Sequence, residues 1–337
     1  MVEVAGRVDR IPIIAVDAMG GDIGPGVVVP GAVDAVREEG GFTLVLYGDE
    51  PAIHAALAGL DTADLPITVH ACGQAIDMGE PPAAAIRNKP DSSIVRAITD
   101  HKAGAVDGFV SAGSTGAIVA ASLIILGRLA AVDRPAIASR IPTVSGDCLL
   151  LDIGANVQCT PQHLLTFAQM GDVYAREMLG LEAPRVALLN NGEEETKGTE
   201  VMVAAHRLLR ASDLHFVGNV EGRRLMHGDA DVVVTDGFTG NVALKLIEGM
   251  APFLQGVAER RVSPEERAVV LPALRILQAR LDYADYGGAL LLGIAGVSVI
   301  AHGASSRRAV RNAVLAGARL AGRDIPGRLG ARLAAGA

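Results

Sequence analysis

The chain has 337 residues, a net charge of −8 at pH 7 and a hydrophobic content of 50%, which is enough for a large core in one or two domains. Its acidic charge, its lack of tryptophan and an aromatic content of 3% disfavour nucleic-acid binding. The longest apolar stretch, Ala117 to Leu126, is shorter than the ~20 residues of a membrane span, and the opening segment MVEVAGRVDR lacks the apolar core of a signal peptide. We therefore expect a cytoplasmic protein.

Short apolar runs alternate with longer helical patterns along the chain. This alternation predicts an α/β protein with a three-layer αβα architecture, a mostly parallel sheet and one catalytic domain over residues 1–321. The Gly/Ala/Arg-rich tail, 322–337, is expected to fray. The predicted strands are Ile11 to Val16, Phe42 to Tyr47, Ile67 to His70, Gly108 to Ser111, Ala136 to Ile141, Leu149 to Asp152, Val186 to Leu189, Leu214 to Gly218 and Val232 to Thr235. The predicted helices include Ser92 to His101, Thr115 to Leu129, Pro161 to Leu179 and Gly198 to Leu209.

The first strand ends in a loop that contains Gly20, Gly21 and Asp22. This loop does not match G-x-G-x-x-G, so a Rossmann dinucleotide site is not predicted. Tandem glycines after a strand can form a nest of N–H groups that binds an anion. The plain structural alternative is a tight turn with an aspartate cap.

A loop of small and hydroxyl residues lies between the strand at 108–111 and an apolar helix. Its N–H groups and hydroxyls suit phosphate, while helix capping by Ser114 or Thr115 explains the same residues. The segment also approaches the G-x-S-x-G elbow of hydrolases, in which Ser114 would be a nucleophile that needs a histidine base. The candidate residues are Ser111, Gly113, Ser114, Thr115 and Gly116.

Polar residues follow three further strands. Asn156 comes after CLLLD, Asp236 and Gly237 come after VVVT, and His302 precedes GASS. Asparagine can donate to an oxyanion, and histidine can act as a general acid or base. Both residue types are also common in loops and hydrogen-bonded turns.

The segment Asn190 to Glu200, NNGEEETKGTE, lies between an apolar strand and a helix. It is nearly a P-loop, G-x-x-x-x-G-K-[ST], but lysine and glycine are exchanged and three glutamates would repel a nucleotide phosphate tail. A P-loop is therefore rejected. A single lysine, Lys197, next to a helix N-terminus remains as a candidate anion-binding group.

Cysteine and histidine show no spacing typical of a metal or redox site. Cys72, Cys148 and Cys159 form no C-x-x-C pair, and no two of the eight histidines are in H-x-x-x-H spacing. We expect neither a metal nor a cofactor.

A helical pair is predicted at about residues 250–286, projecting from the α/β body. Ser263 and Pro264 are typical of a helix start, and Pro272 is expected to kink or split the helix that follows. This stretch suits a dimer contact, an ordinary packed helix, or a docking surface for a membrane or an acyl chain. The residues expected on one apolar face are Val270, Leu274, Leu277 and Leu281.

The complete set of motifs resembles the PlsX family of phosphate acyltransferases, from about Ile13 to about Ala316. The motifs are, in order, VDAMGGD, VSAGSTGA, LLDIGANV, NNGEEETKG, GNVEG, DGFTGNV, DYADYGGA and AHGASS. The resemblance implies a fold similar to isocitrate and isopropylmalate dehydrogenases and to phosphotransacetylases. It also implies transfer of a fatty acyl group from acyl-acyl carrier protein to inorganic phosphate, which supplies phospholipid synthesis through a membrane-bound glycerol-3-phosphate acyltransferase. Family members are homodimers that associate loosely with the membrane.

On this basis we expect Lys197 and Asn241 to be catalytic. Lys197 would hold phosphate or the oxygen of the reacting carbonyl, and Asn241 would be a neutral donor to the same centre. The glutamates Glu193, Glu194 and Glu195 would fix Lys197, and the glycine loops would supply N–H groups. Phosphate is already anionic, so no covalent acyl-enzyme is expected.

The chain departs from the family pattern at three positions. The family usually has asparagine where Ser114 stands and isoleucine where Asn191 stands, and asparagine is common at the position of Ile23. Asparagine in relatives argues against Ser114 as a nucleophile. The alternatives are an NAD- and Mg²⁺-dependent hydroxyacid dehydrogenase, which the shared fold permits, and a membrane or carrier-protein docking module.

The expected partner, acyl carrier protein, is acidic, so a local basic patch is expected to receive it. The candidates are Arg260, Arg261, Arg267, Arg275, Arg307, Arg308 and Arg311.

Overall fold

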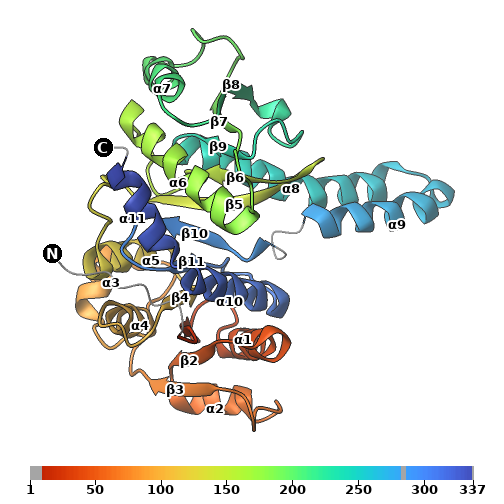
Figure 1. Ribbon diagram of the computed structural model, residues 1–337. Coiled ribbons are helices and arrows are strands. Elements are labelled where there is room, and N and C mark those ends of the chain that lie inside the picture. The colour runs from red at the N-terminus through yellow and green to blue at the C-terminus, as the bar shows by residue number, and fades with distance from the viewer. Residues whose placement is uncertain (1–9, 282–285, 336–337) are drawn as a thin grey trace. The chain divides into compact units, whose positions relative to one another are not determined.

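Figure 1 shows the computed structural model, which describes residues 10–281 and 286–335; the side chains of 278–281 are not described. The chain divides into two compact units, which are described in turn. The first consists of Met1–Pro135, Glu177–Gly180 and Gly287–Ala337, and the second of Ala136–Arg176 and Leu181–Tyr286. The expected single domain over residues 1–321 includes parts of both units.

The first unit contains strands in the order β3-β2-β1-β4-β11-β10. The pairs β3–β2, β2–β1, β1–β4 and β4–β11 are parallel, and β10 is antiparallel to β11. Parallel strands are covered on both faces and are therefore continuously apolar, and every residue of β4 is buried. The strands are β1 Ile13–Asp17, β2 Thr43–Gly48, β3 Ile67–Ala71, β4 Gly108–Ser111, β10 Ala289–Leu292 and β11 Ser298–Ile300.

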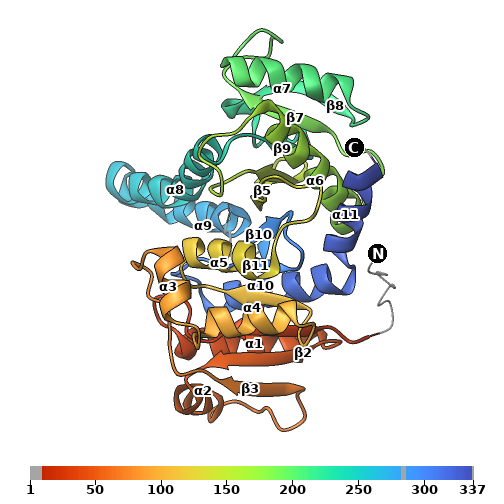
Figure 2. The same cartoon turned by 90° about the vertical axis from the view of Figure 1, so that its left-hand side faces the viewer.

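Helices cover both faces of this sheet, with α1 and α10 on one face and α4 and α5 on the other (Figures 1 and 2). Small residues allow the close approach, since a Cβ at Gly317 of α10 would lie 3.0 Å from Val110 of β4. The helices are α1 Pro25–Glu39, α2 Glu50–Leu57, α3 Pro82–Asn88, α4 Ser93–Lys102, α5 Thr115–Ala121, the π-helical turn Ser122–Leu126, α10 Arg307–Gly322 and α11 Ile325–Ala335.

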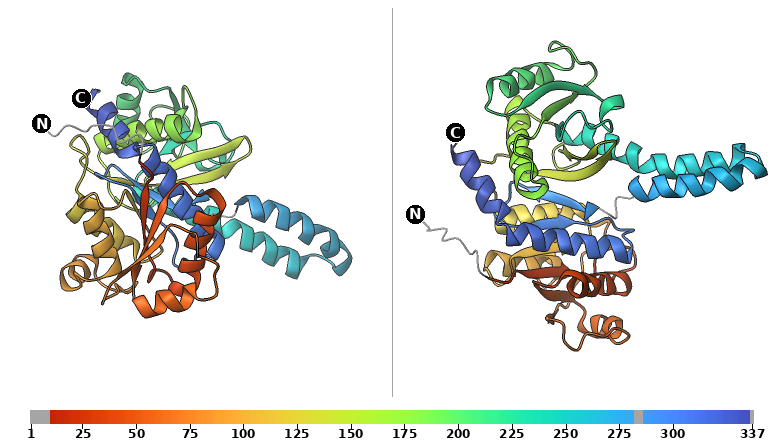
Figure 3. Two further views of the ribbon diagram at one scale, coloured as in Figure 1. Left: turned by 60° about the horizontal axis from the view of Figure 1, so that its bottom comes forward. Right: turned by 45° about the vertical axis from the view of Figure 1, so that its right-hand side comes forward.

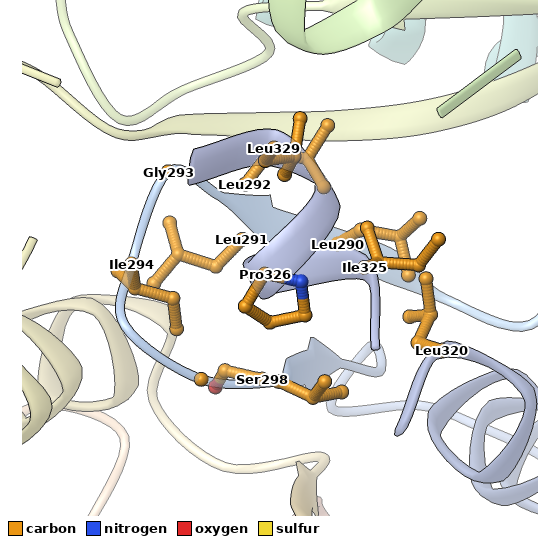
Figure 4. A pocket seen from close by; sticks show the side chains of 12 residues that line it. Leu290, Leu291, Leu292, Gly293, Ile294, Ser298, Leu320, Ile325, Pro326 and Leu329 are labelled. Atoms are coloured by element: carbon orange, nitrogen blue, oxygen red, sulfur yellow. The ribbon is translucent and has the colours of Figure 1, made fainter. Parts of the chain in front are cut away.

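Helix α11 corrects the expectation that the tail from residue 322 frays. Its residues Ile325, Leu329 and Leu333 repeat every four positions and are buried. Figure 4 shows Ile325, Pro326 and Leu329 closing a small apolar cavity together with residues of β10. Burial of this apolar stripe outweighs the low-complexity composition that suggested fraying.

The second unit contains strands in the order β5-β6-β9-β7-β8. β5 and β6 form an antiparallel hairpin, and the pairs β6–β9, β9–β7 and β7–β8 are parallel. The strands are β5 Ala136–Thr143, β6 Gly146–Leu151, β7 Val186–Asn190, β8 Phe216–Glu221 and β9 Val232–Val234. Within this unit α6 covers one face of the sheet and α8 the other (Figure 2). The helices are α6 Pro161–Leu179, α7 Glu200–Ala211, the 3-10 turn Gly222–Arg224, α8 Gly237–Arg261 and α9 Pro264–Leu281.

Helices α8 and α9 form the hairpin that extends from the second unit (Figure 3). The expected helix start at Ser263 is present, because Glu266 N donates to Ser263 Oγ at 3.3 Å and Ser263 N donates to Glu266 Oε2 at 3.2 Å. Pro272 was expected to kink or split this helix; it does not split it, since α9 continues through it. Leu281 and the DYAD part of the motif at 282–289 fall outside the described side chains or residues.

Two further sequence expectations need correction. The helix expected over Thr115 to Leu129 ends earlier, where Gly127 has φ 87° after the π-helical turn. Strand β10 was not predicted, and β11 was expected only as a strand end before His302, without bounds. The three-layer α/β architecture is confirmed by the helices on both faces of mostly parallel strands. Among the described helices none is long and apolar enough to cross a membrane.

Candidate active site

The first unit has a topological switch point between β1 and β4. From β1 the chain continues to β2 and β3 on one side and returns to β4 on the other. Ligands of open parallel sheets bind at the carboxyl ends of strands that flank such a point. Asp17 and Ser111 are register partners at these two ends, so the loops that follow them leave the sheet side by side.

A buried hydrogen-bond chain joins the two loops. Gly113 N donates to Ser111 Oγ at 2.9 Å, and Ser111 Oγ donates to Asp17 Oδ2 at 2.6 Å. The other oxygen of Asp17 accepts from Met19 N at 3.1 Å. Burial raises the pKa of Asp17, and these donors oppose the rise. Asp17 was not among the expected site residues, although it precedes them directly.

The glycines of the first loop are required by close approach and by backbone conformation. A Cβ at Gly20 would lie 2.7 Å from Gly113 N and 2.9 Å from Asp17 Oδ2. Gly21 has φ 84°, which side chains other than glycine rarely adopt. Asp22 N donates to Gly303 O at 2.8 Å, which ties this loop to the one after β11.

The structure corrects which N–H groups of these loops can bind an anion. Those of Asp22 and Gly113 already donate to Gly303 O and Ser111 Oγ. Among the described residues, the N–H groups of Gly21, Ser114, Thr115 and Gly116 donate to no loop or cap acceptor. They are therefore candidates for an anion.

Ser114 caps α5, because its Oγ accepts from Ala117 N at 3.5 Å and the side chain is buried. Among the described residues no histidine is hydrogen-bonded to Ser114. His302 lies in the loop after β11, where its Nδ1 accepts from Ala304 N at 3.1 Å. The geometry favours the capping role of Ser114 over a nucleophile activated by a histidine.

The second unit has its own switch point, between β7 and β9. β7 is followed by β8 on one side, and the chain returns to β9 on the other. The loop after β7 contains Lys197, and the loop after β9 leads to Asn241 in the first turns of α8. Both expected catalytic residues therefore follow neighbouring strands of one unit.

Asp152, at the end of β6, organises the adjoining loop. One oxygen accepts from the N–H groups of Ile137 at 3.0 Å, Gly154 at 3.1 Å and Ala155 at 3.0 Å. The other accepts from Asn156 N at 2.7 Å and Asn156 Nδ2 at 2.8 Å. Burial raises the pKa of Asp152, and these donors oppose the rise. Asn156 was expected to bind substrate, but its side-chain amide donates to this carboxylate.

The start of α8 packs closely on this loop. Gly237 N donates to Asn156 O at 2.8 Å, and a Cβ at Gly237 would lie 2.8 Å from Asp152 Oδ2. Asp236 caps the helix by accepting from Thr239 N and Thr239 Oγ1, each at 2.8 Å. This cap leaves Asn241, one turn further on, exposed to solvent.

Lys197 lies in a loop whose backbone is held by hydrogen bonds and whose lysine side chain is half exposed. Asn190 Nδ2 donates to Lys197 O at 3.0 Å, and Lys197 N donates to Glu194 O at 3.1 Å. Asn219 Nδ2 donates to the same Glu194 O at 2.8 Å. The Lys197 side chain is 49% exposed and its Nζ lies 3.9 Å from Glu194 Oε1, so this ion pair is weak and leaves the ammonium able to bind an anion.

Only one of the three glutamates approaches Lys197. Glu195 forms an ion pair with Arg210 of α7, and Glu193 lines a separate hollow together with Arg224. The expectation that all three fix Lys197 is therefore corrected, because of the three only Glu194 lies within ion-pair distance of it. Sequence reasoning missed Asn219 and Arg210, because they are distant in the chain and only the fold brings them to the loop.

Fewer arginines than expected remain candidates for the basic patch that would receive an acidic partner. Arg307 donates to both oxygens of Asp34 at 2.5 and 2.6 Å, and Arg311 donates to Glu38 at 2.8 Å. These pairs join α10 to α1 within the first unit. Arg260, Arg261 and Arg275 of the hairpin are exposed and stay candidates for an acidic partner.

The described residues contain no group of three or more His, Cys, Asp and Glu side chains arranged for a metal. The loops of the first unit offer N–H groups, and those of the second offer the exposed ammonium of Lys197 and the exposed amide of Asn241. Such groups bind phosphate and stabilise a carbonyl oxygen that gains negative charge.

Comparisons with known proteins agree with this chemistry. A family model described as "Fatty acid synthesis protein" matches residues 13–328. The phosphate acyltransferase of Heliobacterium modesticaldum is 49% identical over 310 residues, covering 89% of this chain and 91% of its own length. That of Pelotomaculum thermopropionicum is 47% identical over 321 residues, covering 94% and 92%.

A phosphotransacetylase structure from Streptococcus pyogenes superposes with a TM-score of 0.63 at 18% identity, covering 92% of this chain and 94% of that one. At this identity the likeness shows the fold alone. The family model and the sequence relatives span nearly the whole chain, and this chain therefore belongs to the PlsX family of phosphate acyltransferases.

Proposed function

We propose that this acyltransferase transfers a fatty acyl group from acyl-acyl carrier protein to inorganic phosphate, and that the acyl phosphate enters phospholipid synthesis. The observation that carries the proposal is the loop after β7, which holds the backbone of Lys197 through its carbonyl and its N–H and leaves its ammonium half exposed. Support for phosphate and an acyl group as substrates comes from the names of the relatives.

The reaction needs charge stabilisation more than it needs a base. Phosphate is anionic near neutral pH, and its oxygen attacks the thioester carbon to form a C–O bond. The carbonyl oxygen gains negative charge as the tetrahedral intermediate forms, and the C–S bond then breaks to release the carrier thiolate. Lys197 and Asn241 lower the energy of this step by binding the phosphate or the carbonyl oxygen. The N–H groups of Gly21, Ser114, Thr115 and Gly116 are assigned to anion binding.

Direct transfer is part of the proposal. An acyl-enzyme would need an activated serine or cysteine, whereas the Ser114 hydroxyl caps α5. The thiol Cys148 is buried and its pKa is raised by burial, so it is a poor nucleophile.

Peripheral membrane attachment, dimerisation and supply of a membrane-bound glycerol-3-phosphate acyltransferase complete the proposal. Val269, Ile276 and Leu277 of α9 are 73%, 70% and 56% exposed, and exposed apolar side chains of this number indicate a contact surface. Replacing Leu274 and Leu277 with aspartate should weaken vesicle flotation or reduce the mass of the dimer. Unchanged flotation and unchanged mass would remove this part of the proposal.

The direct assay measures acyl phosphate. Purified protein is incubated with acyl-acyl carrier protein and phosphate, and the product is trapped with hydroxylamine as the acyl hydroxamate. The expected result is hydroxamate that depends on phosphate and on Lys197. Failure of the wild-type protein to form hydroxamate from any acyl donor would reject the function. Absorbance change with NAD and a 2-hydroxy diacid would support the dehydrogenase alternative instead.

A further inference from the structure

A chain of hydrogen bonds in the second unit connects a buried histidine to the loop that contains Lys197. His206 lies on α7 and is only 4% exposed. Its Nδ1 lies 3.0 Å from Asn219 Oδ1 on β8, and Asn219 Nδ2 donates to Glu194 O at 2.8 Å. Lys197 N donates to the same Glu194 O at 3.1 Å. Three hydrogen bonds therefore lead from the interior of this unit to the backbone of Lys197.

The chemistry of the acceptors fixes the direction of each bond. A backbone carbonyl can only accept, so Asn219 must turn its NH₂ group toward Glu194 O and its oxygen toward the histidine. That oxygen also can only accept, so His206 must carry a proton on Nδ1. The neutral Nδ1–H ring and the doubly protonated ring both supply this donor, so the bond does not depend on the charge of the ring.

A polar ring buried at His206 is costly unless a hydrogen bond compensates for its removal from water. The ring packs edge-on against Phe216, with ring centroids 5.0 Å apart, and an apolar side chain could make the same contact. The other buried residues of α7, Ala205 and Leu209, are apolar. What histidine adds to this packing is the N–H group that holds the amide of Asn219.

Glycines allow the rest of the loop to enclose Lys197. Gly198 has φ 93°, and a Cβ there would clash with Asn190 Oδ1, so glycine is needed for Asn190 Nδ2 to reach Lys197 O at 3.0 Å. A Cβ at Gly192 would lie 2.7 Å from Lys197 Cγ, so the stem of the lysine lies against this glycine. The carbonyl and the stem of Lys197 are therefore held as well as its N–H, and its ammonium stays half exposed.

We infer that His206 and Asn219 are positioning residues for Lys197. They hold the turn from Glu194 to Lys197 in the conformation that directs the ammonium toward its anionic ligand. This inference rests on the proposed function, in which Lys197 binds phosphate or the carbonyl oxygen. Such positioning matters because a displacement of about 1 Å can cost about 100-fold in rate.

Helix α7 has a second link to the loop, which is weaker. Arg210, four residues after His206, forms an ion pair with Glu195, and the two side chains are 64% and 61% exposed. Exposed ion pairs contribute little to stability, whereas a hydrogen bond away from water is stronger. The bond between His206 and Asn219 is therefore the main link from α7 to the loop.

The first test separates the hydrogen bond from the shape of the side chain. Leucine and asparagine have nearly the same shape, so His206→Leu and His206→Asn both remove the ring, but only asparagine supplies an N–H donor near the position of Nδ1. Hydrogen exchange of the amides of residues 191–199 should rise by about fivefold in His206→Leu and in Asn219→Leu, because a typical net hydrogen bond is lost. His206→Asn should stay close to the wild type.

His215→Leu is the matched control for this measurement. His215 lies in the same unit at the start of β8, and its Nδ1 is 3.2 Å from Ala183 O. It is at the opposite end of β8 from the Lys197 loop, so its replacement should leave the exchange of residues 191–199 unchanged.

The second test asks whether the two residues act through Lys197. Asn219→Leu should lower kcat for hydroxamate formation by about tenfold when Lys197 is present. In the Lys197→Ala background the same substitution should change kcat by less than about twofold, because the displaced group is already absent. A loss of folded protein would instead lower kcat by the same factor in both backgrounds. His206→Asn should recover most of the rate that His206→Leu loses.

Equal loss in the two backgrounds, or equal loop exchange in His206→Leu and His206→Asn, would overturn the inference while leaving the proposed function intact. Absence of hydroxamate from every acyl donor with wild-type protein would reject the proposed function, and with it the catalytic role of this loop.

Discussion

The strand-end loops of the two units are both held by a buried aspartate, but they offer different candidate groups for binding an anion. Each unit has a buried aspartate at the carboxyl end of a strand, Asp17 in the first and Asp152 in the second, and each aspartate fixes a glycine loop. The candidate groups of the first unit are neutral N–H donors, whereas the second adds the exposed ammonium of Lys197. Under the proposed function, both units offer groups for an anion and the catalytic charge is Lys197 of the second.

The largest expected effect is the loss of that charge. Lys197→Ala should reduce the formation of acyl phosphate by about 100-fold, since about 3 kcal/mol of charge stabilisation is lost. Lys245→Ala is the control, because Lys245 is also 49% exposed and lies in the same unit, paired with Glu248 at 2.7 Å. Near wild-type turnover in folded Lys197→Ala protein would place the catalytic charge elsewhere and break the contrast between the units.

Replacement by asparagine should destabilise the protein more at Asp152 than at Asp17. Asp152 faces five N–H donors, so Asp152→Asn must turn its own NH₂ toward at least two of them and should lower the free energy of unfolding by about 3 kcal/mol. Asp17 accepts from the Ser111 hydroxyl, which can rotate and accept instead. Asp17→Asn should therefore cost about 1 kcal/mol.

Urea unfolding of both variants measures this difference. Equal destabilisation would show that the hydroxyl in the first unit is not an adjustable partner. A folded Asp152→Asn protein of unchanged stability would contradict the five-donor arrangement.

Many of the strands, the helix start at Ser263 and the strand-end motifs could be predicted from the sequence. Strands such as β4 and β7 are continuous apolar runs, and the capping box at Ser263 is a local pattern, so both could be inferred from neighbouring residues. The motifs at the strand ends were found because glycine and polar residues interrupt apolar runs there. Parallel pairing then brings the ends of β1 and β4, and of β7 and β9, together.

What the sequence could not provide are contacts between residues distant along the chain. Asn219 donates a hydrogen bond to Glu194 O, and Arg210 forms an ion pair with Glu195. No local sequence pattern predicts either contact. Likewise Arg307 and Arg311 resemble a free basic cluster until the fold places Asp34 and Glu38 beside them. The sequence shows which charged and polar side chains are present. Only the tertiary contacts show which of them already form hydrogen bonds or ion pairs within the protein.

Acid should weaken the first unit through a partly buried histidine, His101. His101 Nδ1 donates to Val106 O at 3.0 Å and its Nε2 accepts from Val297 N at 2.9 Å, an arrangement that requires the neutral ring. Burial lowers the pKa of His101 below its usual value near 6.5. Its contribution to stability is therefore complete above about pH 6.5 and falls by up to about 1.4 kcal/mol per pH unit as the pH drops toward the lowered folded-state value.

Hydrogen exchange of the first unit between pH 7.5 and pH 5 measures this loss against a His101→Gln variant, which lacks the titrating ring. Wild-type protein should lose protection in β4 and β11 as the pH falls, while His101→Gln should show less pH dependence in the same strands. Identical pH dependence in the two proteins would remove His101 as the cause.

The smallest expected effect concerns Ser114. Ser114→Asn should keep acyl-phosphate formation within about threefold of the wild type, because asparagine caps a helix about as well as serine does. A serine nucleophile would instead require loss of nearly all turnover and an acyl-enzyme detectable by mass spectrometry in the wild-type protein. Retained activity would confine the role of Ser114 to holding the first turn of α5. The first unit would then act through backbone N–H groups and the second through charge, as their strand-end loops indicate.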